Sequence, residues 1–126
     1  MKLDANVLII NEPNSAHTAE LIAFLHEHGC HVCKEMKPGP AIEKAQNIPF
    51  DVIILDAGIK EIEITGIIRI LKELNPQSRI IVNTHSNSKS QEVKIRGEKI
   101  FYYHIESFGT NELKLAVQSA LERKKP

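Results

Sequence analysis

Short runs of apolar residues, separated by polar segments, recur along the chain. Three of these runs, at residues 7–10, 52–55 and 80–82, are wholly apolar, which is typical of strands buried on both faces of a parallel sheet. A weaker, alternating pattern predicts a strand at residues 30–36. The β-branched and aromatic residues at 100–105 predict a fifth strand.

Segments with helical spacing of apolar residues follow these strands. We predict helices at five places: residues 15–28, a short helix from Pro40, residues 64–74, a short marginal helix within 85–99, and residues 110–121 with Thr110 as N-cap. In the third helix, Ile67, Ile68, Ile70 and Leu71 are expected to face the core. Val93 and Ile95 are expected to anchor the marginal helix.

Strands that alternate with helices indicate an α/β fold. We expect a doubly wound, five-stranded parallel sheet with helices on both faces and right-handed crossovers. The 126 residues suffice for one domain, and residues 1–126 are interpreted as a single domain with a core from about 6 to 121.

Composition narrows the classes of function. The 16 basic and 16 acidic residues balance, so binding to nucleic acid through a basic surface is not expected. No apolar run reaches the roughly 20 residues that span a bilayer, and the first residues pass directly into a strand pattern without a signal peptide. Two cysteines give no disulfide framework. We therefore expect a cytoplasmic protein with no membrane contact.

Polar side chains stand where the strands end. Asp56 follows the apolar run at 52–55, Asn11 and Glu12 follow the first strand, and Thr84 closes the fourth. Ligands bind at the carboxyl edge of open α/β sheets. Glu12 and Asp56 would repel each other unless a cation such as Mg²⁺ lay between them. Asp56 could then act as a nucleophile that forms an acyl phosphate. The competing interpretation is that these residues are solvated strand ends.

A second group of candidate ligands lies at residues 26–33, which hold three histidines and two cysteines. Soft ligands of this kind bind zinc or form redox pairs. Cys30 and Cys33 would point to opposite faces of a strand, which opposes a disulfide. The segment also changes from helix to strand, which scatters the ligands. A helix end followed by a half-buried strand is the preferred interpretation.

From about residue 6 to 121, the chain resembles the receiver domain of bacterial two-component response regulators. Asp56 after its strand is similar to the phosphoacceptor, Asn11-Glu12 to the acidic pair, Thr84 to the switch residue and Tyr103 to the aromatic whose rotamer reports activation. The resemblance implies a flavodoxin-like (CheY-like) fold in which Asp56 accepts phosphate. It implies Glu12, Asp56 and the Gly58 carbonyl as Mg²⁺ ligands, with Asn11 a further candidate.

Three residues depart from the pattern of this family. Glu106 stands where the family has a lysine, Asn11 replaces an acidic residue, and His85 occupies a position that is normally small. Two like charges a few ångströms apart cost on the order of 1–4 kcal/mol, so Glu106 should oppose a phosphoryl group on Asp56. Two interpretations of His85 stay open: a solvated loop residue, or a cation that partly replaces the lysine.

Two functions follow from these observations. In the first, Asp56 accepts phosphate from a sensor histidine kinase or a phosphotransfer protein, and the domain signals to a protein partner through the face around residues 93–108, with Tyr102, Tyr103 and Phe108 as aromatic anchors. In the second, the domain is an atypical, phosphate-independent interaction or dimerisation module, and a homodimer fits either function. Neither version is an enzyme.

Overall fold

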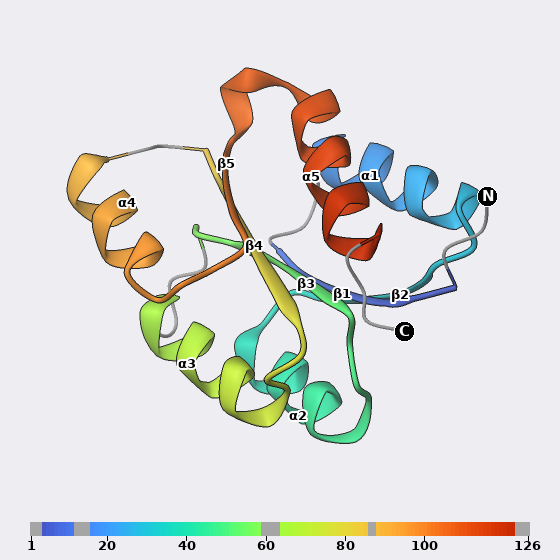
Figure 1. The fold of residues 1–126 in the computed structure, drawn as a ribbon, viewed down its shortest axis with the longest axis horizontal. Helices are drawn as coiled ribbons and strands as arrows, with labels where there is room; N and C mark the ends of the chain where they lie inside the picture. Colours follow the sequence, from blue (N-terminus) through green and yellow to red (C-terminus); the bar gives the residue numbers. More distant parts are fainter. Residues whose placement is uncertain (1–3, 12–15, 59–63, 86–87, 123–126) are drawn as a thin grey trace.

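A computed structural model describes residues 4–11, 16–58, 64–85 and 88–122 (Figure 1). Five parallel strands form one sheet in the order β2-β1-β3-β4-β5, which confirms the predicted fold class. The strands are β1 (Asn6–Ile10), β2 (His31–Glu35), β3 (Val52–Asp56), β4 (Arg79–Thr84) and β5 (Tyr102–Ile105). β3 lies at the centre of the sheet, and all five of its residues are buried.

Helices cover both faces of the sheet, as Figure 1 shows. They are α1 (Ala16–Glu27), α2 (Pro38–Asn47), α3 (Ile64–Leu74), α4 (Lys89–Arg96) and α5 (Thr110–Glu122), with a short 3-10 turn η1 (Glu106–Phe108) after β5. α1 and α5 pack together on one face, and α2 packs beside α3 on the other, where α4 also lies. Two apolar cores result, one on each face of the sheet.

Several predicted boundaries and core positions differ from the structure. α2 begins at Pro38 rather than Pro40, because proline fits the first helical turn, where no backbone donor is needed. α5 begins at Thr110 itself, and β5 begins two residues later than predicted.

Two side chains that we expected in the core are exposed. Ile70 is 39% exposed because it lies beside the apolar stripe of α3 formed by Ile67, Ile68 and Leu71. Val93 is 65% exposed, whereas the Ile95 side chain of the same helix, α4, is buried. Positions two apart on a helix face different directions, so only one of this pair can reach the core.

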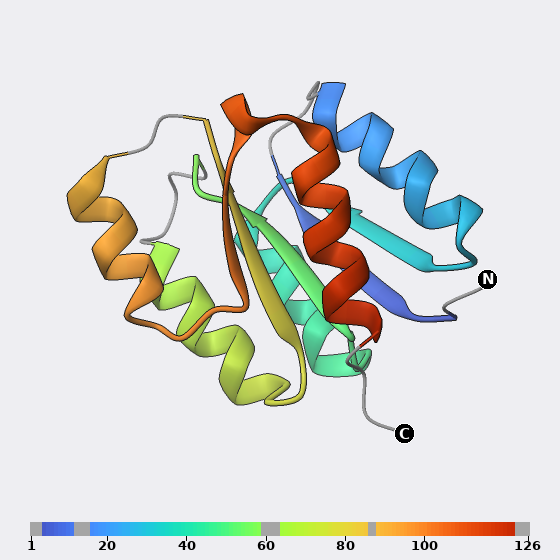
Figure 2. The same cartoon turned by 45° about the horizontal axis from the view of Figure 1, so that its top comes forward.

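The carboxyl ends of the strands meet at one edge of the sheet, which lies toward the top of Figure 2. The register pairs Asp56 with Asn83 and Thr84 with Ile105. The polar residues at these strand ends are therefore neighbours, as the sequence predicts. Among the helices that the structure describes, none is long and apolar enough to cross a membrane.

Candidate functional site

Asp56 is the central acid of the site. It ends the buried strand β3 and is itself only 5% exposed. Its Oδ1 accepts a hydrogen bond from the backbone N–H of Gly58 at 2.8 Å. A Cβ atom at position 58 would lie 3.2 Å from that same oxygen, so glycine leaves the room for this close approach. One carboxylate oxygen is thus fixed by the backbone, and the other is directed elsewhere.

The second oxygen of Asp56 faces His85. His85 Nε2 lies 3.8 Å from Asp56 Oδ2, and His85 Nδ1 lies 2.6 Å from Glu106 Oε1. Asn83 Nδ2 donates to Glu106 Oε2 at 3.2 Å. His85 is therefore not an isolated loop histidine. Its ring lies between Asp56 and Glu106, the carboxylate that we expected to oppose a phosphoryl group on Asp56.

Thr84 and Tyr103 form a buried pair beside this site. They are 2% and 3% exposed, and their hydroxyl groups are hydrogen-bonded to each other. Burial raises the pKa of Tyr103 above its ordinary value, and the bond from Thr84 opposes part of that rise. The Arg96 guanidinium lies 5.3 Å from the centre of the Tyr103 ring. Tyr103 thus points inward, and our expectation that it forms a surface anchor is wrong.

The edge also holds oxygen atoms suited to a hard cation. Asn11 is 4% exposed, and its Nδ2 donates to Thr18 Oγ1 at 2.7 Å. Its buried Oδ1 has no hydrogen-bond partner among the described residues. Asn11 and Asp56 line the same small cavity. Amide and carboxylate oxygens are the ligands that Mg²⁺ prefers, so these two residues fit the ion. Glu12 lies outside the described residues.

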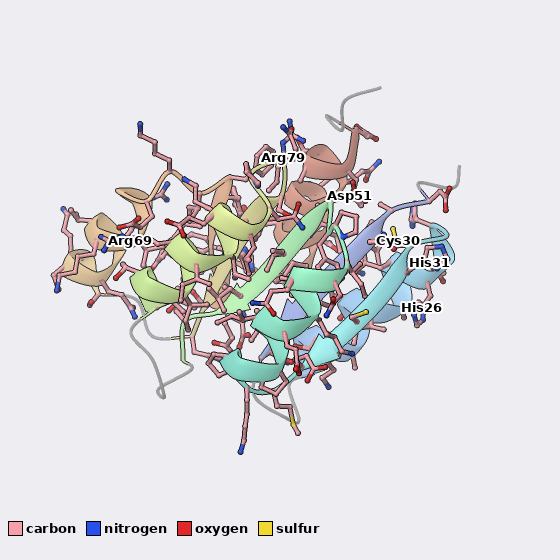
Figure 3. The ribbon with its side chains drawn as sticks, turned by 90° about the horizontal axis from the view of Figure 1, so that it is seen from below. His26, Cys30, His31, Asp51, Arg69 and Arg79 are labelled. Carbon is pink, nitrogen blue, oxygen red and sulfur yellow. The ribbon has the colours of Figure 1, made fainter. Side chains whose placement is uncertain are left out.

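The cysteines and histidines of the alternative site lie at the opposite edge. Figure 3 shows His26, Cys30 and His31 near the beginning of β2. Cys30 is buried in the core, while the His31 side chain is 73% exposed and pairs with Asp4 at 3.5 Å. Within the described part of the chain, no three His, Cys, Asp or Glu side chains gather as metal ligands would. The segment therefore lacks the arrangement that structural zinc needs.

Sequence reasoning missed Asn83. This residue holds Glu106, lines the cavity with Asp56, and keeps its own Oδ1 buried without a hydrogen-bond partner in the described residues. The available signal was a polar residue one position before the end of a buried strand. Because side chains alternate along a strand, Asn83 and Thr84 serve opposite faces of the same edge.

We compared the sequence and the structure with those of known proteins. No family model matches the sequence, and no curated protein matches it. Among solved structures, a response regulator receiver domain protein (CheY-like) from Methanospirillum hungatei is 18% identical, with a TM-score of 0.85 over 96% of each chain. A beryllofluoride-activated dimer of the NtrC4 receiver domain is 26% identical, with a TM-score of 0.83 over 95% of this chain and 98% of that chain.

A third similar structure is a response regulator protein from Burkholderia pseudomallei with a phosphorylated aspartic acid, calcium ion and citrate. It is 23% identical, with a TM-score of 0.79 over 94% of this chain and 69% of that chain. The five parallel strands and the covering helices of this chain superpose on the fold of these neighbours. The structural neighbours of this chain are response regulator receiver domains, and the chain has their CheY-like fold over nearly its whole length.

Proposed function

We propose that this domain accepts a phosphoryl group on Asp56 and signals the change to a protein partner. The observation that carries the proposal is the pose of Asp56. One of its oxygens is held by the Gly58 amide, and the other faces the side chains at the carboxyl edge. A carboxylate fixed in this way is oriented for attack, which removes part of the entropic cost of reaction.

The transfer step is a displacement at phosphorus. A lone pair of Asp56 Oδ2 forms the new O–P bond. The P–N bond of a donor phosphohistidine breaks, and its electron pair returns to the donor ring nitrogen. With acetyl phosphate, a P–O bond breaks instead and acetate leaves with the pair. When bound, Mg²⁺ supplies positive charge to the phosphoryl oxygens. Asn11 and Asp56 are the described residues that would hold the ion.

The buried pair Thr84–Tyr103 is suited to report the reaction. The Thr84 hydroxyl stands at the end of β4, beside the strand end that carries Asp56. A phosphoryl oxygen would compete with Tyr103 for this hydroxyl, and any shift of the Tyr103 ring would alter its contact with Arg96 on α4. The event at Asp56 would thus reach the outer face of the molecule.

The partner surface is proposed on the face around residues 93–108. Val93 and Phe108 are 65% and 63% exposed there, and exposed apolar side chains on one face are typical of interaction sites. A sensor histidine kinase or phosphotransfer protein is the proposed donor, in the cytoplasm, and a second copy of the domain is one form of partner. We propose a signalling domain rather than an enzyme.

A second candidate is a phosphate-independent interaction module. Its support is specific: Glu106 stands at the lysine position, and the nearby His85 ring already lies against both Glu106 and Asp56. In this version the His85 ring occupies the space between the two carboxylates, and the surface acts without phosphate.

One experiment separates the two candidates. The purified protein is mixed with Mg²⁺ and beryllofluoride, and amide NMR spectra are recorded with and without the phosphoryl mimic. Phosphoryl acceptance requires shifts around Asp56, Thr84 and Tyr103, and a slower change with acetyl phosphate. Spectra that stay unchanged at these three residues would remove the first candidate and leave the second.

A further inference from the structure

His85 is the only described side chain whose two ring nitrogens each face a carboxylate of the site. Nδ1 is at hydrogen-bond distance from Glu106, 2.6 Å, while Nε2 remains 3.8 Å from Asp56 Oδ2. The second separation is too long for a hydrogen bond. The ring is therefore held from the Glu106 side, and its other nitrogen is directed at the oxygen that we propose to be phosphorylated.

Glu106 is in turn fixed by the sheet. Its second oxygen accepts from Asn83 Nδ2 at 3.2 Å, and its side chain is only 19% exposed. The register that pairs Thr84 with Ile105 places the next residues of the two strands, His85 and Glu106, side by side. Backbone pairing and a side-chain bond thus determine where the His85 ring lies, although that ring is 52% exposed.

We propose that His85, positioned by Glu106, contacts the phosphoryl oxygens on Asp56 in the role that receiver domains give to a lysine. This inference rests on the proposed function, since it needs a phosphoryl group on Asp56. An imidazolium donates from both nitrogens. One N–H keeps its bond to Glu106, while the other makes a charge-assisted bond to a phosphoryl oxygen.

In this arrangement, each of the unusual residues at positions 85 and 106 makes the other compatible with a phosphoryl group on Asp56. Without Glu106, the half-exposed His85 ring would be free to turn into solvent. Without His85, the Glu106 carboxylate would oppose the charge of the phosphoryl group. In the proposed arrangement, the His85 ring keeps its contact with Glu106 on one side and faces Asp56 Oδ2 at 3.8 Å on the other. The expected penalty from Glu106 is therefore offset by its neighbour.

The test measures the affinity for beryllofluoride, in the presence of Mg²⁺, by ¹⁹F NMR. His85→Ala should weaken binding by about tenfold to a hundredfold, the range for loss of a hydrogen bond to a charged group. The double variant His85→Ala/Glu106→Lys, which supplies the family's cation in place of the pair, should recover most of that loss. His31→Ala, which removes a histidine paired with Asp4 at the other edge, should bind like the wild type.

A second readout tests the positioning role of Glu106. In ¹⁵N spectra of the His85 side chain, both ring nitrogens of the wild type should shift when beryllofluoride binds. Glu106→Gln keeps an oxygen acceptor but removes the negative charge, so it should change the Nδ1 signal already in the free protein. It should also reduce the affinity less than His85→Ala does.

The outcomes are distinct. If the wild type binds beryllofluoride and His85→Ala binds equally well, the inference is wrong and the proposed function stands. If His85→Ala binds more tightly, His85 blocks the site, which also overturns the inference. If neither the wild type nor any variant binds, the proposed function fails, and the inference fails with it. The ¹H–¹⁵N backbone spectrum of each variant shows whether it is folded.

Discussion

An aspartate lies at each end of β3, Asp51 just before the strand and Asp56 at its last position. The two side chains have the same chemistry but different hydrogen-bond partners. Asp51 precedes the strand at the amino edge of the sheet, near Arg79 in Figure 3. Its Oδ2 accepts from the Asn6 backbone N–H at 2.9 Å, its own N–H donates to the Asn6 carbonyl at 2.8 Å, and its carbonyl accepts from the Arg79 N–H at 3.0 Å. Asp51 therefore joins three strand beginnings through backbone groups.

Asp56 ends the same strand and makes different contacts. Its Oδ1 accepts the bond from the Gly58 N–H within its own loop, and its Oδ2 faces His85 across 3.8 Å. Close by, buried oxygens of Asn11 and Asn83 have no hydrogen-bond partner in the described part of the chain. Burying an oxygen without a partner costs stability. The comparison indicates that the amino edge stabilises the fold, whereas the carboxyl edge carries a cost that ligands can relieve.

The largest expected effect is on phosphoryl transfer. Asp56→Asn should lose all labelling by acetyl phosphate, because the neutral amide is not a nucleophile. Asp51→Asn should be labelled like the wild type. Intact mass spectrometry of the three proteins, after equal incubation with Mg²⁺ and acetyl phosphate, checks this. If Asp56→Asn is still labelled, another residue accepts the phosphoryl group.

For the free energy of unfolding, we expect the larger effect at Asp51 and the smaller one at Asp56. Asp51→Ala leaves the Asn6 N–H without its acceptor, so the free energy of unfolding should fall by about 1–3 kcal/mol. Asp56→Ala should change it by less than about 1 kcal/mol, because the bond from the Gly58 N–H to this carboxylate lies within a single loop. Urea denaturation measures both values. Asp51→Asn is the matched control, since its amide oxygen can still accept the bond. A larger loss in Asp56→Ala would reverse the assignment of the two edges.

The sequence predicted the central elements well because local signals agree there. β3 and α3 have the predicted ends, since the apolar run at 52–55 and Asn75-Pro76 mark them plainly. α2 was predicted less well because Pro38-Gly39-Pro40 reads equally as a chain break and as a first helical turn. Exposed Val93 shows that an apolar residue on a polar helix need not anchor it.

The site was predicted in part. Asp56, Thr84 and Tyr103 lie at or beside the carboxyl edge, but the relation between His85 and Glu106 was not seen. The sequence suggests His85 as a partial replacement for the lysine, but it does not predict the contact of His85 with Glu106, so Glu106 is expected to oppose phosphate. Their contact depends on the register of β4 and β5, which sequence patterns do not fix for neighbouring parallel strands. Two residues that depart from the family pattern, His85 after β4 and Glu106 after β5, follow adjacent strands. That coincidence is the sequence signal for their contact.

Mg²⁺ should also distinguish the two edges of the sheet, through a smaller effect on the free energy of unfolding. If the oxygens of Asn11 and Asp56 bind the ion, Mg²⁺ at ten times its Kd should add about 1.4 kcal/mol to the free energy of unfolding, seen as a Tm higher by a few degrees. Differential scanning fluorimetry across a Mg²⁺ titration measures this. Asp56→Asn should lose the increase and Asp51→Asn should keep it. Equal gains in both variants would place the ion elsewhere.

The smallest expected effect is alkaline destabilisation at the carboxyl edge. Burial raises the pKa of Tyr103, so the folded protein holds this proton at a pH where the unfolded chain releases it. The contribution is complete below the ordinary tyrosine pKa of about 10 and is lost as pH rises through the raised value. Urea unfolding between about pH 8 and 11 should therefore show a steeper loss for the wild type than for Tyr103→Phe. Asp51→Asn, altered at the amino edge alone, should keep the wild-type slope. If Tyr103→Phe keeps it as well, the buried hydroxyl does not couple this edge to pH, and the difference between the two edges rests on Asp56 and its neighbours.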